Sequence, residues 1–252
     1  MPTVITLTYL YNSGFSLDFP DRFLVVDYIQ GPLPLPKDKP ITFIVTHAHS
    51  DHYNPRIFTM KGAENATFVL STDVEESSSD GKFIQLSSTV EETRRKKIIY
   101  DPSRTLRLEP GDSQSFQDIH WTAFGSTDQG ISILFELGGI SFFHAGDLNA
   151  WKWPDWPEED QDREVSDFME ILDDLEKFPV DILFAPLDPR LEGNAFLGPM
   201  AMIQRLKPQM FIPMHFREKM DITQFFRDHY QAQTKTFLTE ITGKGQQIRI
   251  RS

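Results

Sequence analysis

The sequence contains no cysteine, and this absence excludes both disulfide bonds and metal centres with thiolate ligands. Any metal ion would have to be held by imidazole and carboxylate groups, which suit several first-row divalent metals. Proteins that remain in the reducing cytosol have no need of disulfides, so we expect a cytoplasmic protein.

Long hydrophobic runs are also missing. The longest apolar stretch, residues 131–146, is interrupted by Glu136 and by the pair Gly138-Gly139, and it is shorter than the ~20 residues that a membrane span requires. The N-terminal segment MPTVITLTYLYNSGF has no basic region before its apolar residues, unlike a signal peptide. We therefore expect no membrane partner.

Basic residues are scarce relative to acidic ones: 25 Lys and Arg oppose 37 Asp and Glu, for a formal net charge of −12. Such a surface repels a phosphate backbone, so we expect no nucleic-acid partner. A small molecule is the expected partner, and a local basic pocket for a small anion remains open. The composition gives no indication of the oligomeric state.

The order of apolar segments predicts an α/β protein. Strand patterns dominate up to about residue 147, and strands then alternate with amphipathic helices. Residues 149–178 begin as a Trp- and Pro-rich loop and are expected to continue as a helix, with one apolar face formed by Val165, Phe168, Met169, Leu172 and Leu175. Another is expected at 221–230, with Asp221 as its N-cap. No segment is typical of a linker, so we interpret residues 1–252 as one domain.

The segment THAHSDH concentrates three of the seven histidines, together with one aspartate, in six positions: His47, His49, Asp51 and His52. It follows the apolar strand pattern ITFIV. Side chains two residues apart on an extended chain point to the same side, and a following turn can direct the next pair to a second point nearby. A chance cluster and a satisfied polar turn are the alternatives, but the pattern favours a site for two metal ions.

The motif His-x-His-x-Asp-His after an apolar strand resembles the signature of the metallo-β-lactamase fold superfamily. Asp27 in FLVVDY, Asp147 in FFHAGD and His215 in FIPMHF resemble further motifs of that superfamily in the same order. The resemblance implies an αββα four-layer sandwich, with two mixed β-sheets flanked by helices. The sequence is most similar to small hydrolases without added domains, a group that includes the ascorbate-6-phosphate lactonases.

The resemblance also implies two metal sites. One would use His47, His49 and a third histidine; the other would use Asp51, His52 and His215, with Asp147 bridging the two. The third histidine is missing, because the corresponding segment WTAFGSTDQG contains none. Asp128 is the candidate substitute, and Ser126 is a weaker one.

Further residues near these motifs have two interpretations each. Asp27 and His144 would support the metal ligands from behind, or serve as ordinary strand-end residues. Trp151 and Trp153 would form a wall of the substrate pocket, or anchor a loop. Asp188 and Arg190 would bind the substrate, with Arg190 binding a carboxylate or phosphate group of it, or the two residues would form a salt bridge with each other.

The function that the resemblance implies is metal-dependent hydrolysis of a small ester, lactone or phosphodiester by a metal-activated water. Asp147 would fix the metal spacing, and Asp51 would accept a proton. One or two divalent ions are expected, zinc first, with manganese or iron as alternatives. The sequence has neither a Gly-x-Ser-x-Gly motif nor a Gly-rich phosphate loop. A non-catalytic metal-binding or sensing protein is the main alternative; an iron-dependent redox protein and a nuclease are weaker ones.

Overall fold

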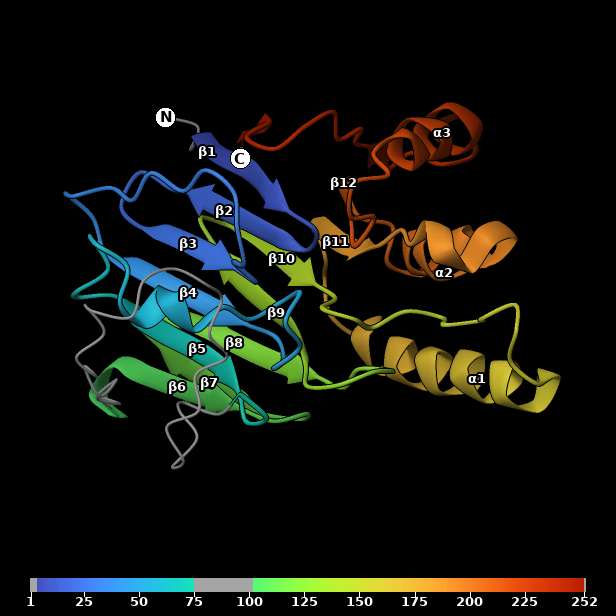
Figure 1. Cartoon of the computed structure of the whole chain (residues 1–252), viewed down its shortest axis with the longest axis horizontal. Coiled ribbons are helices and arrows are strands. Elements are labelled where there is room, and N and C mark those ends of the chain that lie inside the picture. The colour runs from blue at the N-terminus through green and yellow to red at the C-terminus, as the bar shows by residue number, and fades with distance from the viewer. Residues whose placement is uncertain (1–3, 75–101, 252) are drawn as a thin grey trace, which may run out of the picture.

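The computed structural model describes residues 4–74 and 102–251, which form two seven-stranded mixed β-sheets packed face to face (Figure 1). The first sheet has the order β14 (Gln247–Arg251), β1 (Val4–Tyr11), β2 (Gly14–Asp18), β3 (Phe23–Val26), β4 (Ile41–Val45), β5 (Thr67–Ser71) and β6 (Thr105–Leu108). The second has the order β13 (Phe237–Leu238), β12 (Met210–Met214), β11 (Ile182–Pro186), β10 (Ile140–His144), β9 (Ser132–Leu137), β8 (Ile119–Phe124) and β7 (Ser113–Phe116).

The α-helices lie beside the second sheet in Figure 1: α1 (Glu158–Leu175), α2 (Leu197–Leu206) and α3 (Asp221–Tyr230). The short 3₁₀ helices are η1 (Pro55–Phe58), η2 (Pro102–Arg104), η3 (Pro189–Phe196) and η4 (Gln231–Gln233). The outer face of the first sheet has its own apolar cluster, in which loop residues and Ile57 of η1 pack against β3, β4 and β5. The predicted sandwich of two mixed sheets flanked by helices is therefore confirmed.

Aromatic side chains from both sheets fill the space between them. Phe15 of β2 meets Phe184 of β11 with ring centroids 5.0 Å apart, and Phe19 meets Phe142 of β10 at 5.8 Å. Within the second sheet, Phe135 stacks on Phe142 at 5.2 Å. β4 and β11 are buried along their whole length, as expected for parallel strands that are covered on both faces.

Two details of the predicted helices are wrong. Asp221 is the first residue of α3, and Met220 is its N-cap without a side-chain capping bond. Met169 is 36% exposed, whereas Phe168, Leu172 and Leu175 of α1 are buried. The apolar stripe of α1 is thus narrower than the sequence pattern indicated. No helix among the described residues is both long enough and apolar enough to cross a membrane.

The topology brings distant segments of the chain to one edge of the sandwich. β3 to β6 run parallel in the first sheet, and β10 to β13 run parallel in the second. The residues that follow β3, β4, β10, β11 and β12 carry the predicted site, and the carboxyl ends of parallel strands share an edge.

Candidate metal centre

Three buried histidines and one aspartate face a common point at this edge. Nε2 of His52 lies 3.0 Å from Oδ1 of Asp147, and Nε2 of His215 lies 3.5 Å from the same oxygen. Nε2 of His47 lies 3.5 Å from the other oxygen, Oδ2. Asp147 therefore touches imidazoles from two different segments of the chain, which is the geometry of a bridging ligand.

The atoms that face this point lack hydrogen bonds. Nε2 of His47, His52 and His215 and Oδ1 of Asp147 are all buried without a hydrogen-bond partner among the described residues. A buried polar atom without a partner costs free energy of the order of 1–3 kcal/mol. Four such atoms around one point fit a divalent cation, which accepts lone pairs from imidazole and carboxylate alike.

The opposite nitrogen of each imidazole is held by an oxygen. Nδ1 of His52 lies 2.8 Å from Oδ2 of Asp27, and Nδ1 of His47 lies 3.1 Å from the Thr46 hydroxyl. Nδ1 of His215 lies 3.0 Å from Oδ2 of Asp188. When Nδ1 carries the proton and donates it to oxygen, the lone pair on Nε2 is left for a metal.

Asp27 orders this region from a fully buried position. Its carboxylate accepts hydrogen bonds from the backbone N–H of Thr46 at 2.9 Å and from the Thr46 hydroxyl at 2.7 Å. His144 lies beside it, 3.9 Å away, and donates through Nε2 to the carbonyl of Ser13. His144 therefore packs against Asp27 and contacts none of the candidate ligands directly.

The candidate ligands form two groups, whose ligand atoms lie within 4.8 Å of one another: His47, His49, Asp128 and Asp147 in one; Asp51, His52 and His215 in the other. The first group is more open, because the side chains of His49 and Asp128, 3.3 Å apart, are 44% and 43% exposed. Asp128, the candidate substitute for the missing third histidine, belongs to the first group. The Ser126 hydroxyl accepts a hydrogen bond from the backbone N–H of Asp128.

The pKa values of the three buried histidines are shifted in different directions. Burial lowers the pKa of His52, but the Asp147 and Asp27 carboxylates outweigh it and raise that pKa to about 10. Burial also opposes protonation of His215, yet Asp147, Asp188 and Asp51 raise its pKa to about 9. By contrast, burial and the charge of His52 lower the pKa of His47 to about 4.

The pKa values of two carboxylates in the site, those of Asp147 and Asp51, are lowered. Burial raises the pKa of Asp147, but His215 and His52 more than offset it and hold that pKa well below its usual range. The contact with His215, whose Nε2 lies 3.4 Å from Asp51 Oδ2, lowers the pKa of Asp51. Asp128 differs, because burial and the nearby Asp147 charge raise its pKa. The ionised forms of Asp147 and Asp51 and the protonated forms of His52 and His215 thus stabilise one another.

Asp188 pairs with both Arg190 and His215. It is 1% exposed, and besides His215 it binds the backbone N–H of Arg190 at 2.9 Å and the Arg190 guanidinium through both oxygens. Its pKa is lowered to about 2, since His215 and Arg190 outweigh the effect of burial. Of the two interpretations of Asp188, the structure shows the pairing with Arg190, and it adds a contact that holds the His215 imidazole.

The tryptophans form one wall of the site. Trp151 is buried, donates its indole N–H to the backbone carbonyl of Asp147 at 2.8 Å, and meets the His215 ring edge-on at 5.6 Å. Trp153 stacks on Trp151 with centroids 5.5 Å apart and planes at 4°, and the Arg190 guanidinium lies 5.0 Å over the Trp153 ring. Trp151 thus lies beside two candidate ligands, and Trp153 stacks on it.

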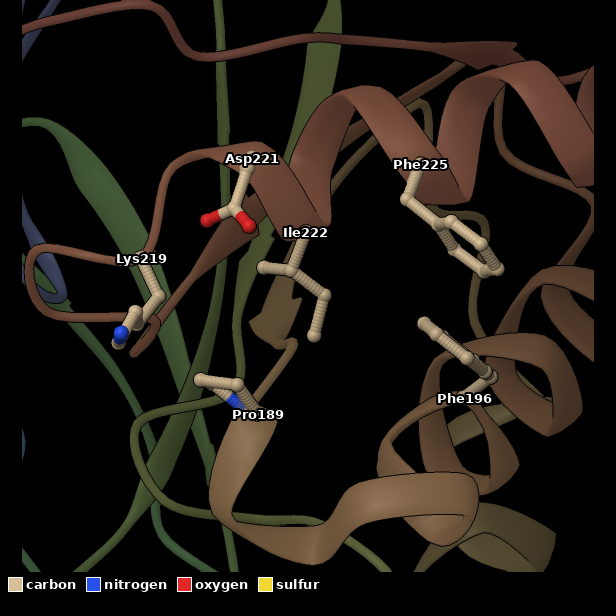
Figure 2. Close-up of a pocket in the computed structure, with 6 residues that line it drawn as sticks. All are labelled: Pro189, Phe196, Lys219, Asp221, Ile222 and Phe225. Atoms are coloured by element: carbon tan, nitrogen blue, oxygen red, sulfur yellow. The ribbon is translucent and has the colours of Figure 1, made fainter.

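A hollow of about 380 Å³ lies beyond this wall, between η3 and α3 (Figure 2). Its lining residues are Pro189, Phe196, Lys219, Asp221, Ile222 and Phe225. Figure 2 shows the two charged side chains at one end and the two phenylalanines at the other. Phe196 and Ile222 also pack against the cluster that contains Trp151, so this hollow adjoins the site without containing it.

The sequence analysis missed three residues that shape the centre. The Asn12 side chain contacts Asp51, and the Thr46 hydroxyl donates to Asp27; both partners lie far along the chain. Gly130 adopts a φ of +72°, and a Cβ there would lie 2.2 Å from the Thr46 carbonyl oxygen and 2.4 Å from the His47 Cβ. Only glycine allows this approach. No local pattern marks any of the three.

The sequence matches the family model described as "Beta-lactamase superfamily domain" over residues 6–155. No curated protein matches it in sequence. Among solved structures it is similar to Igni18, a metallo hydrolase from the hyperthermophilic archaeon Ignicoccus hospitalis, with a TM-score of 0.63, 14% identity and coverage of 98% of both chains.

Two further solved structures share the fold. YhfI from Bacillus subtilis, a metallo-β-lactamase fold protein, has a TM-score of 0.60 and 11% identity, and the match covers 99% of this chain and 100% of that one. CmlA, a diiron β-hydroxylase from Streptomyces venezuelae, has a TM-score of 0.61 and 12% identity, covering 98% of this chain and 54% of that one. With identities this low, the TM-scores establish a common fold and no more.

Proposed function

This chain belongs to the β-lactamase superfamily, and from that premise we propose that it is a metal-dependent hydrolase of a small ester, lactone or phosphodiester. One observation carries the proposal: the Nε2 atoms of His47, His52 and His215 are buried without hydrogen bonds around the Asp147 carboxylate. The description of Igni18 as a metallo hydrolase supports it.

The residues present fit one or two divalent ions. Asp51, His52 and His215 would hold one; His47, His49 and Asp128 would hold the other; Asp147 would contact both. When bound, such an ion supplies Lewis-acid chemistry: it polarises a carbonyl or phosphoryl group and makes water a stronger nucleophile at neutral pH. We propose zinc first, and manganese or iron as alternatives, since imidazole and carboxylate suit all three.

The protein's own side chains would orient the substrate and move the proton. The Asp51 side chain is 29% exposed, so its carboxylate can both ligate and accept a proton from water. Trp151 and Trp153 offer a flat apolar wall, and Arg190 lies over it with its guanidinium fixed by Asp188. A lactone, as in the ascorbate-6-phosphate lactonases that the sequence resembles, is one substrate of this size, and the net charge of −12 favours a small molecule over nucleic acid.

Metal removal tests this proposal. Protein treated with a strong chelator should lose hydrolysis of a panel of aryl esters, lactones and phosphodiesters, and added zinc, manganese or iron should restore it. Asp147→Asn should lower kcat by at least a hundredfold, because it weakens the contact shared by both ligand groups. Asp118→Asn, an exposed aspartate in the β7–β8 turn, is the matched control. Full activity after chelation would contradict the proposal.

A non-catalytic metal-binding or sensing role is the alternative, favoured by the open first group, in which half-exposed His49 and Asp128 stand without a third histidine. Under this alternative the protein would bind metal tightly, yet the metal-loaded protein would hydrolyse no member of the panel.

A further inference from the structure

Basic and acidic side chains alternate in a row of five residues with His215 at its centre. Arg217 Nη2 lies 3.5 Å from Asp51 Oδ2, and that oxygen lies 3.4 Å from His215 Nε2. On the other side of the ring, His215 Nδ1 lies 3.0 Å from Asp188, whose carboxylate binds Arg190. A guanidinium therefore stands at each end, and each is separated from the histidine by one carboxylate.

The two arginines are held very differently. Arg190 is bound by both oxygens of Asp188 and lies over the Trp153 ring, so its charge is largely compensated by the protein itself. Arg217 has a 52% exposed side chain, and its contact with Asp51 at 3.5 Å is the one ion pair recorded for it among the described residues. Of these two guanidinium groups, that of Arg217 is therefore the one available to bind an anionic ligand.

The backbone at Arg217 is strained. Its φ is +54°, and His215, two residues earlier, has a φ of +63°. A residue with a Cβ in the left-handed region costs roughly 1–2 kcal/mol, and glycine at position 217 would avoid this cost. Strain of this kind persists where the surrounding structure fixes it, and it is concentrated at functional sites.

We propose that the substrate carries an anionic group, a carboxylate or a phosphate, and that Arg217 binds it. This inference rests on the proposed hydrolase function. Once the Asp51 carboxylate ligates a divalent cation, its attraction for the guanidinium weakens, and the half-exposed Arg217 is left with its charge uncompensated beside the site. An anionic group of the substrate would compensate that charge, because guanidinium binds carboxylate and phosphate through paired hydrogen bonds.

A matched pair of esters tests the inference. 4-Nitrophenyl acetate is neutral, whereas 4-nitrophenyl hemisuccinate carries a free carboxylate and has the same leaving group. In zinc-loaded protein, Arg217→Gln should lower kcat/KM for the hemisuccinate at least tenfold and for the acetate less than twofold. Arg217→Gly removes the same charge and relieves the φ strain, and it should lower the ratio of kcat/KM for the hemisuccinate to kcat/KM for the acetate by the same factor. A folding defect in Arg217→Gln would then not explain the change in this ratio. Arg163→Gln, on the exposed face of α1, removes the same charge elsewhere and should leave the ratio unchanged.

Direct binding provides a second readout. Calorimetric titration of zinc-loaded protein with acetate, and separately with methyl phosphate, should show affinity that falls at least fivefold in Arg217→Gln, and the anion with the larger loss identifies the group. Equal losses on both esters, or unchanged anion affinity, would overturn the inference, since Arg217 would then merely steady Asp51. If neither ester is hydrolysed, the proposed function fails on these substrates, and the anion titration still decides the role of Arg217.

Discussion

Nδ1 of His215 lies 3.0 Å from the carboxylate of Asp188, just as Nδ1 of His52 lies 2.8 Å from that of Asp27. Both aspartates are almost completely buried. Each fixes the rotation of its imidazole, so that Nε2 faces Asp147. The centre is therefore ordered in advance by residues that touch no metal themselves.

Removing either carboxylate should weaken metal binding. Asp188→Asn and Asp27→Asn preserve size but withdraw the charge that holds an imidazole, and losses of roughly 10–100-fold in metal affinity are typical of such changes. Zinc titration of metal-free protein measures this. Asp181→Asn is the control, because Asp181 binds Ser141 and Gln209 away from the centre; it should lower stability and leave zinc affinity unchanged.

We expect the two ligand groups to bind metal unequally. The group of Asp51, His52 and His215 is mostly buried, whereas His49 and Asp128 are half-exposed and belong to the other group. Calorimetric titration should show two steps, with His215→Ala abolishing the tight step and His49→Ala only the weak one. Two equal steps, or survival of the tight step in His215→Ala, would contradict this.

The apolar patterns predicted the strands, because they are local signals, whereas the two-sheet sandwich and the convergence of the histidine motif with Asp147 and His215 were implied by the resemblance to the metallo-β-lactamase fold superfamily. The helix face was less well predicted: Met169 has the right spacing but is 36% exposed. The contact of Asp188 with His215 was not predicted, because the two residues are 27 positions apart. Asn12 was missed for the same reason, because nothing in a hairpin turn indicates that it contacts Asp51.

Metal binding should release protons. In the metal-free protein the pKa values of His52 and His215 are raised to about 10 and about 9, so both imidazoles are protonated at pH 7.5 and lose a proton when Nε2 ligates a metal. Zinc affinity should therefore increase as pH rises towards 9 and decrease as pH falls. His47, with a pKa lowered to about 4, contributes no proton at this pH.

The number of protons released is measurable by calorimetry in buffers with different ionisation enthalpies. We expect about two protons per protein at pH 7.5 when the tight site fills, from these two histidines. Asp27→Asn removes one of the charges that raise the pKa of His52 and should reduce the number released. A heat of binding that is independent of the buffer would rule out the protonated cluster.

The β1–β2 turn supports the centre through Asn12, which is 1% exposed and has a φ of +52°. Its side-chain Nδ2 lies 3.5 Å from Asp51 Oδ2, and its carbonyl accepts the His215 backbone N–H at 3.2 Å. One residue thus contacts two candidate ligands from segments far apart along the chain.

Asn12→Gly separates the side chain from the backbone, because glycine adopts this φ without strain and the contact to His215 uses the backbone carbonyl. We expect zinc affinity at the tight site to fall about fivefold, which corresponds to the ~1 kcal/mol of one hydrogen bond. Asp118→Gly, at a φ of +60° in the exposed β7–β8 turn, makes the same kind of change away from the centre and should leave affinity unaltered. Unchanged zinc affinity in Asn12→Gly, together with lower thermal stability, would mean that the turn serves folding alone and that Asp51 is held by His215 and Arg217 without it.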